Sequence, residues 1–317
     1  MSEELTTTSR ELSILSPSEV EEMEHKVRFY ETRQGTGLAF YEYGDPQGRP
    51  VIFFHGTGSH LQATLLHKPG LRRGFRIIAP DRPGVGKSSF RKGWTPLEYA
   101  RDMAELADFL GIETFGALGI SGGGPTLLAS ALAIPERLDW VVDLACAAPV
   151  YGDPEMTQYL GKSDRFYAFM GTRLPLQIFR IPFSLLGILQ TLFKSPASFA
   201  KMFDSSLGEP DKELFRHPDM QYLIMRDFQV LYHGGSLGPA YDAQTVYAPW
   251  GFDVGDISKP LEIFQGKEDK FVPTRFNQYM AEKIPSARLH MLEGMGHFGH
   301  LAYGYALLER LEKTLDL

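Results

Sequence analysis

The sequence predicts an α/β fold: a mostly parallel sheet that starts with an N-terminal β-hairpin and carries helices on both faces. Short strand-like runs, the continuous apolar 51–54 and the mostly apolar 75–79 among them, alternate with segments of helical spacing. This pattern is typical of parallel strands that are buried on both faces. Between about 150 and 256 the apolar residues keep a helical spacing, and no buried strand stands out. We expect this stretch to form a helical cap inserted over the carboxyl edge of the sheet.

Three parts are expected along the chain. Residues 1–25 form a polar, peripheral arm, residues 26–150 and 251–317 form the α/β core, and residues 151–250 form the cap. A chain of 317 residues with 43% hydrophobic residues is long enough, and apolar enough, to bury a sizeable core.

Composition narrows the function classes. The net charge of −7 offers no basic field for nucleic acid or an anionic membrane. The single cysteine, Cys146, excludes an internal disulfide and a cysteine-rich zinc site. The longest apolar stretch, 174–193, contains Arg180 and Pro182, so we expect no integral membrane segment. The acidic, polar first residues do not resemble a secretory signal, so a cytoplasmic location is expected.

The elements of the core follow in order. Ser16, Pro17 and Glu19 are typical of a helix start, so a short helix to His25 is expected. A hairpin of 27–32 and 38–43 comes next. Buried strands are predicted at 50–54, 75–79, 115–118, 138–148, 261–265 and 288–292, and helices at 95–110, 126–133, 274–283 and 302–315.

The most informative stretch is the corner between the strand that ends near Leu118 and the helix that begins near Thr126. There Ser121 lies between Gly119 and Gly123, which is the G-x-S-x-G pattern of a nucleophile elbow. Side chains on either flanking residue would collide with neighbouring backbone, and the N-terminus of the following helix favours negative charge beside the serine. Ser121 is therefore the candidate nucleophile.

Four signatures in register make the sequence resemble the α/β-hydrolase superfamily, in its serine-nucleophile form with a helical cap. They are His55-Gly56-Thr57-Gly58, the loop from Asp81 to Ser88, the elbow, and the pair of loops at 266–269 and 294–297. The resemblance implies a catalytic triad in the order Ser121, Asp269, His297. It also implies that the backbone N–H groups of Thr57 and Gly122 form the oxyanion hole.

Four residues compete for these roles. His300 lies near His297, but only His297 has the Gly-x-Gly-His setting that lets a loop bend back to the elbow. Glu268 precedes Asp269, Asp143 lies within a predicted strand, and His55 is expected to organise its loop. The histidines show no ligand spacing such as H-E-x-x-H, so we expect neither a metal nor a cofactor.

A serine nucleophile favours acyl transfer, with hydrolysis of a small to medium apolar or aromatic ester as the leading hypothesis. Aminopeptidase, amidase and carbon–carbon bond hydrolase activities remain open because they use the same triad. An aminopeptidase would need cap carboxylates for the substrate amine; the available ones are Glu155, Glu209, Asp211 and Glu213. A small-molecule receptor with little turnover is the alternative from another class. The aromatic residues of the cap are expected mostly to pack it onto the core, with a minority lining the pocket.

Overall fold

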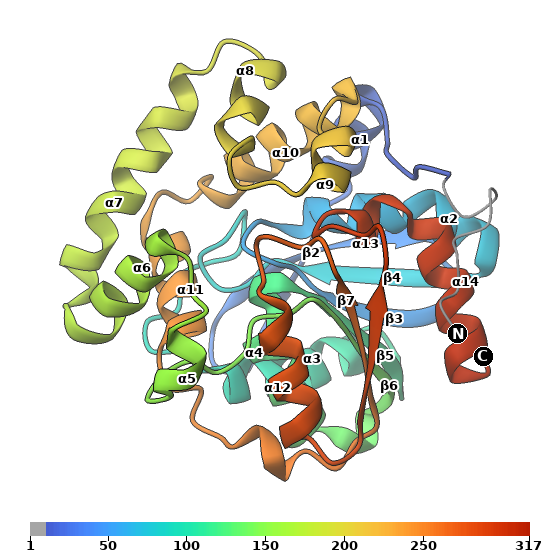
Figure 1. Ribbon diagram of the computed structural model, residues 1–317. Helices are drawn as coiled ribbons and strands as arrows, with labels where there is room; N and C mark the ends of the chain where they lie inside the picture. The colour runs from blue at the N-terminus through green and yellow to red at the C-terminus, as the bar shows by residue number, and fades with distance from the viewer. Residues whose placement is uncertain (1–10) are drawn as a thin grey trace.

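A computed structural model describes residues 11–317 of the chain, and its centre is one eight-stranded sheet (Figure 1). The strand order is β1-β2-β4-β3-β5-β6-β7-β8. In this spatial order, every neighbouring pair between β4 and β8 is parallel. The strands are β1 (Arg28–Glu31), β2 (Gly37–Gly44), β3 (Arg49–Phe54), β4 (Phe75–Pro80), β5 (Phe115–Ile120), β6 (Leu138–Leu144), β7 (Leu261–Gly266) and β8 (Ala287–Leu292).

The predicted hairpin and parallel sheet are confirmed. Strands β1 and β2 pair antiparallel, with Arg28 opposite Phe40, and β2 pairs antiparallel with β4. The remaining six strands run parallel, so their carboxyl ends meet at one edge. The loops that follow β3, β5, β7 and β8 therefore converge there, and these are the loops that carry the predicted site residues.

Helices cover both faces of the sheet, as predicted. Ile52 and Phe54 of β3 pack in one core with α3 (Pro96–Phe109), α4 (Gly124–Ala133) and α12 (Thr274–Lys283). Val51 and Phe53 point to the opposite core, which α14 (Gly304–Leu315) and the 3₁₀ helix η2 (His60–Leu66) help to build beside α2 (His67–Arg73). Alternate residues of one strand thus enter different cores, which explains why the strand is apolar throughout.

The N-terminal segment is less peripheral than the sequence predicts. Residues 1–10 of the expected arm lie outside the described residues. Helix α1 (Pro17–Glu24) has the predicted capping box between Ser16 and Glu19. Leu15 and Val20 are fully buried in the second core, and Glu24 forms an ion pair with Arg226. A second ion pair, between Glu19 and Lys68, and a hydrogen bond from the Tyr222 hydroxyl to Glu21 also join this polar helix to the body.

Two predicted boundaries need correction. Strand β6 ends at Leu144, not near 148, because Ala145 has a positive φ of 48° and the chain turns there. The expected helix at 302–315 is two helices, α13 (Gly299–Ala302) and α14, with a break at Tyr303. The hydroxyl of Ser13 accepts a hydrogen bond from the N–H of Gly304, the first residue of α14.

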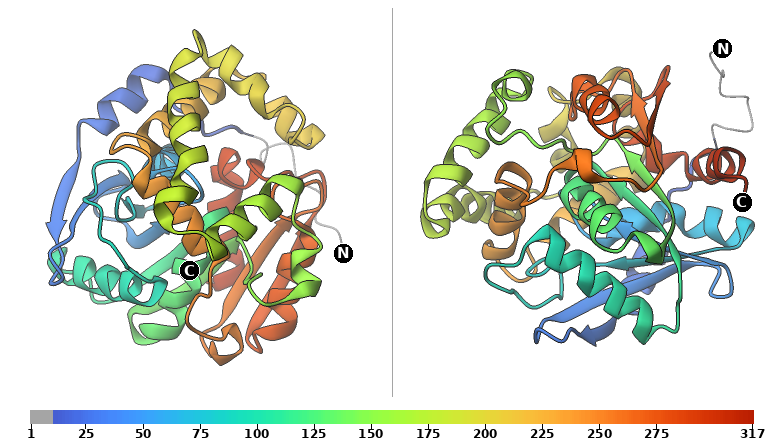
Figure 2. Two further views of the ribbon diagram at one scale, coloured as in Figure 1. Left: turned by 90° about the vertical axis from the view of Figure 1, so that its left-hand side faces the viewer. Right: turned by 90° about the horizontal axis from the view of Figure 1, so that it is seen from below.

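The segment predicted as a cap consists of helices. They are α5 (Pro154–Thr157), α6 (Lys162–Arg173), α7 (Leu176–Leu189), α8 (Pro196–Ala200), α9 (Glu209–Leu214), α10 (Pro218–Leu231) and α11 (Leu237–Tyr247). Helices α6, α7 and α11 lie beside the α/β body, and α7 is the outermost of the three (Figures 1 and 2). We call residues 151–250 the helical segment. Across residues 11–317, no helix combines the length and apolar character needed to cross a membrane.

Candidate active site

Ser121 occupies a strained corner between β5 and α4. One turn of 3₁₀ helix, Ser121–Gly123, joins the two elements, and Ser121 has a φ of +53°. Side chains adopt this left-handed region only at a cost in energy, so the surrounding contacts must hold the serine there. A Cβ atom on Gly123 would lie 2.3 Å from the carbonyl oxygen of Phe54, and one on Gly119 would lie 2.9 Å from Leu127 Cδ2. The predicted collision with backbone is thus confirmed at Gly123, whereas at Gly119 the obstacle is the side chain of Leu127.

Asp269 and His297 lie in the loops that follow β7 and β8. The Nδ1 atom of His297 is 2.8 Å from Oδ2 of Asp269. The other carboxylate oxygen, Oδ1, accepts hydrogen bonds from the backbone N–H groups of Phe271 at 2.8 Å and Val272 at 2.9 Å. Because both oxygens have partners, the carboxylate is fixed in orientation and favours the histidine tautomer with its proton on Nδ1.

The electrostatics of this pair suit a base. Burial acts to raise the pKa of Asp269, but the charge and hydrogen bond of His297 outweigh it and lower that pKa below its ordinary value. Burial acts to lower the pKa of His297, but the charge and hydrogen bond of Asp269, helped by Asp211, raise it above its ordinary value. An ionised carboxylate therefore lies beside a histidine that can hold an additional proton.

Ser121 and His297 line the same cavity, together with Thr57 and Gly122. Within residues 11–317, no hydrogen bond joins the Ser121 hydroxyl to the His297 ring. The ring stacks on Phe271, with a centroid distance of 5.4 Å. Proton transfer from Ser121 to His297 would require a change of serine rotamer or a small shift of the histidine loop, and catalytic hydrogen bonds are often loose before substrate binds.

The loop after β3 lies directly against the elbow. A Cβ atom on Gly122 would be 2.7 Å from Thr57 Oγ1 and 3.2 Å from the Thr57 backbone nitrogen. The absence of a side chain at Gly122 permits this close approach between the two peptide units whose N–H groups are the expected oxyanion donors. The loop is also bonded to the 3₁₀ helix η2, because the N–H of Gly56 donates a hydrogen bond to Oε1 of Gln62 at 2.7 Å.

The competing residues have other partners. His300 is buried, its pKa is lowered to about 3 by burial, and it does not line the cavity. Glu268 accepts a hydrogen bond from the N–H of Met295. Asp143 is buried, accepts from the N–H of Cys146, and has a pKa raised to about 7 by burial. His55 Nε2 accepts from the N–H of Arg82, so His55 organises its loop as expected.

Three buried carboxylates of the helical segment hold the loops of the site, and sequence reasoning missed this role. Asp211 accepts from the N–H groups of His297 and Phe298 at 2.8 and 2.9 Å. Asp227 accepts from the N–H of Ser59 at 2.8 Å and from its hydroxyl at 2.5 Å, next to the oxyanion loop. The third, Asp242, forms a buried ion pair with the guanidinium of Arg82 in the loop after β4.

These three contacts join positions that are 86, 168 and 160 residues apart in the chain. No local pattern marks such pairs, because an aspartate in a helical stretch is most often a solvated residue. The stretch around Asp211 is itself polar, with Glu209 before it and Lys212 and Glu213 after it, so nothing in the sequence indicates that this carboxylate is buried. Through these carboxylates the helical segment is bonded to the histidine loop and to the oxyanion loop.

The cavity around Ser121 has a volume of about 360 Å³ and mostly apolar walls. Helices α6, α7, α10 and α11 and the loop after β7 supply much of the wall, including Tyr167, Phe183, Leu186, Phe228 and Phe271. Asp164 and Asp227 also line it, and Asp164 accepts a hydrogen bond from the Tyr247 hydroxyl at 2.7 Å. Among the described residues that line the cavity there is no lysine or arginine, so an anionic group would meet no permanent cation there.

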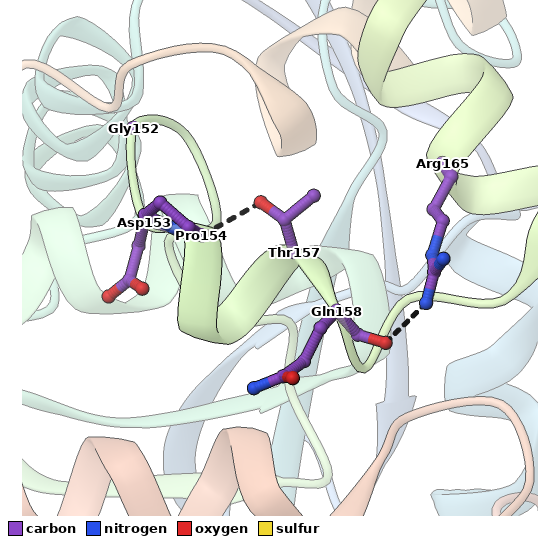
Figure 3. Close-up of a pocket in the computed structure, with 6 residues that line it drawn as sticks. All are labelled: Gly152, Asp153, Pro154, Thr157, Gln158 and Arg165. Carbon is purple, nitrogen blue, oxygen red and sulfur yellow. Dashed lines mark hydrogen bonds between the residues drawn. The ribbon is translucent and has the colours of Figure 1, made fainter.

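A second hollow lies on the surface around α5 (Figure 3). Gly152, Asp153, Pro154, Thr157, Gln158 and Arg165 line it. Thr157 Oγ1 donates to the carbonyl of Asp153 at 2.8 Å, and Arg165 donates to the carbonyl of Gln158. The polar groups of this hollow thus bond to its own backbone, and it shares no lining residue with the cavity of Ser121.

The strand order, the serine corner and the hydrogen-bonded acid and histidine after the last two strands are those of the α/β hydrolases. Residues 49–302 match the family model described as alpha/beta hydrolase fold, and the chain belongs to that family.

Similar proteins have several activities in their names. An uncharacterized hydrolase, YcgS, of Bacillus subtilis is 29% identical over an alignment of 266 residues. The alignment covers 79% of this chain and 85% of that protein. A 2-hydroxy-6-oxo-6-phenylhexa-2,4-dienoate hydrolase of Burkholderia cepacia is 26% identical, covering 85% of this chain and 87% of its own. An esterase of Exiguobacterium antarcticum has a TM-score of 0.66 at 21% identity, covering 91% of this chain and 99% of its own, and shares the fold.

Proposed function

We propose that this chain is a serine hydrolase that cleaves neutral carboxylic esters with small to medium apolar or aromatic groups. One observation carries the proposal: the hydrogen-bonded pair of Asp269 and His297 lies at the same apolar cavity as the strained Ser121. The family includes hydrolases and esterases among its similar members, which supports the reaction class.

In this mechanism the Ser121 oxygen attacks the ester carbonyl carbon while His297 Nε2 accepts the hydroxyl proton. The N–H groups of Thr57 and Gly122 bind the oxyanion that forms. His297 then returns the proton to the leaving alcohol, and the acyl group remains on Ser121. Water, activated by the same histidine, attacks the acyl-enzyme and releases the acid. Asp269 keeps the imidazole oriented and stabilises its protonated form. No cofactor takes part.

The cavity favours a neutral ester over a dianionic substrate. Several relatives are named as hydrolases of 2-hydroxy-6-oxononadienedioate, a dicarboxylate. Carboxylates that leave water need a paired cation, and the lining residues include two aspartates with no lysine or arginine. Carbon–carbon bond hydrolysis of such acids is therefore the less favoured reaction for this chain.

The carboxylates considered for an aminopeptidase are engaged elsewhere. Asp211 bonds to the His297 loop, and Glu155, Glu209 and Glu213 pair with Arg275, Lys212 and Arg216. None of the four lines the cavity. Amide hydrolysis would use the same triad, but no observation favours it over ester hydrolysis.

Hydrolysis of short p-nitrophenyl esters tests the proposal, with Ser121→Ala as the variant and Ser130→Ala of α4 as a control outside the cavity. We expect Ser121→Ala to lower kcat by at least about 10³-fold, as loss of a triad member does. A fluorophosphonate probe should label the wild type and not Ser121→Ala. Full activity in Ser121→Ala would disprove the assignment, and an unlabelled, inactive wild type would favour the receptor.

A further inference from the structure

Helix α7 presents a continuous apolar stripe to solvent. Ile178, Ile181, Leu185 and Ile188 follow one another at intervals of three or four residues, and Leu192 continues the series just beyond the helix. Their exposed fractions lie between 45% and 67%. Single exposed apolar residues are ordinary, but five on one helix face form a contiguous patch of the kind that marks an interaction site.

The opposite face of α7 already has its partners. Phe179 and Phe183 are buried in a small core with Val85, Leu231 and Tyr232. The rings of Phe179 and Phe183 pack with centroids 5.2 Å apart. The outer stripe therefore cannot be a core face, because the helix is already packed on its inner side. Figure 2 shows α7 as the outermost helix on this side of the molecule.

The stretch of chain that carries the stripe is basic, in contrast to the chain as a whole. Residues 161–201 contain six lysines or arginines and one aspartate, whereas the full chain carries a net charge of −7. The six basic residues are Lys162, Arg165, Arg173, Arg180, Lys194 and Lys201, and all are exposed. Within residues 11–317 none of the six forms an ion pair with a carboxylate, although most other arginines of the chain do. This part of the surface therefore carries positive charge that nothing in the described chain neutralises.

We propose that the outer face of α7 docks on an anionic lipid surface. An exposed apolar helix face bordered by basic residues is the combination that lies flat in the headgroup region of a membrane. Anionic lipids attract such residues, at about fivefold in affinity for each lysine or arginine near the surface. The stripe then loses its contact with water among the acyl chains, and the unpaired cations meet phosphates.

A second copy of this chain fits the same face less well. A twofold interface places the same patch on both partners. The basic residues of one copy would then lie near those of the other, and like charges across an interface oppose association. A lipid surface with negative headgroups has the complementary charge.

The position of the stripe also relates it to the cavity. Leu186 lines the cavity of Ser121, and its neighbour Leu185 belongs to the exposed stripe. Only the thickness of α7 separates the proposed lipid contact from the apolar cavity. An apolar molecule dissolved in the bilayer would therefore lie close to the site. The docking itself does not depend on the proposed ester hydrolysis.

Flotation with vesicles tests this proposal without any activity measurement. We expect the full chain to float with phosphatidylcholine vesicles that contain 30% phosphatidylglycerol and not with pure phosphatidylcholine vesicles. Binding should weaken as salt rises, since the attraction is screened over about 10 Å at 0.1 M salt. The double substitution Leu185→Glu with Ile188→Glu should reduce binding at least tenfold. Lys194→Gln with Lys201→Gln should reduce it by roughly 25-fold, at about fivefold per residue.

The matched control adds the same two charges elsewhere. Leu71 on α2 and Leu317 at the chain end are exposed leucines on the side of the molecule opposite α7 (Figure 1). Leu71→Glu with Leu317→Glu should float like the wild type, and thermal melts should show all variants folded. Absence of wild-type flotation at low salt would overturn the proposal. So would equal flotation of Leu185→Glu with Ile188→Glu, or dimers in light scattering that this variant alone abolishes.

Discussion

Asp211 of α9 accepts a hydrogen bond from the backbone N–H of His297 at 2.8 Å, so a carboxylate of the helical segment holds the histidine of the candidate triad. Its second oxygen accepts from the N–H of Phe298 at 2.9 Å. The fit is close, because a Cβ atom on Gly296 would lie 2.3 Å from the same carboxylate. The placement of His297 therefore depends on a helix that lies more than eighty residues earlier in the chain.

Asp211→Asn should impair catalysis more than it impairs folding. The amide has one acceptor oxygen in place of two, so one backbone N–H of the histidine loop loses its partner, at about 1–3 kcal/mol in the free energy of unfolding. The negative charge that helps to raise the pKa of His297 is also lost. We expect kcat to fall and the acid limb of kcat/KM to move to lower pH.

Urea unfolding and a pH–rate profile measure the two effects of Asp211→Asn. Glu213→Gln, on the exposed side of α9, is the matched control and should change neither. An unchanged acid limb in Asp211→Asn would show that the carboxylate does not act on His297.

The pair of Asp269 and His297 predicts the pH dependence of activity. The pKa of His297 is raised, so the ring remains protonated to a higher pH than a free histidine. A base must be unprotonated, and activity should therefore rise through a pKa above about 6.5 and be lost below it. Asp269→Asn should lower that pKa and reduce kcat by up to about 10⁴-fold.

A kcat/KM profile from pH 5 to 9 on a neutral ester checks this expectation for the wild type and for Asp269→Asn. Glu268→Gln is the neighbouring control, since Glu268 bonds to the N–H of Met295 and not to the histidine ring. If Glu268→Gln abolished activity and Asp269→Asn did not, the acid would be assigned wrongly.

Asp227 predicts a pH dependence of stability. Burial raises its pKa to about 6 in the folded protein, above the ordinary value of an exposed aspartate. Between about pH 4 and pH 6 the folded state then holds more protons than the unfolded state at this group. The contribution of Asp227 to the free energy of unfolding therefore decreases as pH rises through this window.

Asp227→Asn should remove that decrease, so the unfolding free energy of the variant relative to the wild type should increase from pH 4 to pH 7. Urea titrations at four pH values measure the difference. Asp219→Asn, a partly exposed position in the first turn of the same helix, serves as the control. Parallel curves for Asp227→Asn and wild type would show that Asp227 titrates normally.

Gly123 should tolerate no side chain. The methyl group of Gly123→Ala would lie 2.3 Å from the carbonyl oxygen of Phe54, the last residue of β3, and 2.9 Å from that of His55 in the oxyanion loop. Overpacking of this kind costs about 1–3 kcal/mol or more. Gly37→Ala in β2 is the control, because the nearest atom to its new methyl is 3.7 Å away. We expect loss of unfolding free energy and of esterase activity in Gly123→Ala only, measured by urea denaturation and ester hydrolysis.

Much of the core could be predicted from sequence because its signals are local. The capping box of Thr95 and Glu98 begins α3 where expected, and helix α12 has the predicted bounds of Thr274 and Lys283. The serine corner could be predicted because the tight turn requires glycines at fixed positions, and these lie within five residues of one another. The break at Tyr303 was readable only in part, from Gly304 in the first turn of the expected helix, whereas the bonds of Ser13 to both sides of the break join positions nearly 300 residues apart.

By itself the sequence determined the strands, the serine corner and which acid and histidine follow the last two strands. Each of these predictions rests on the periodicity of apolar residues or on residue types, such as glycine, that a local backbone conformation requires. The tertiary structure alone decided that Asp211 and Asp227 hold the loops of the site, that no lysine or arginine of residues 11–317 lines the cavity, and that one face of α7 is left bare. These properties arise from packing between distant segments, and no local pattern records which face a neighbour will cover.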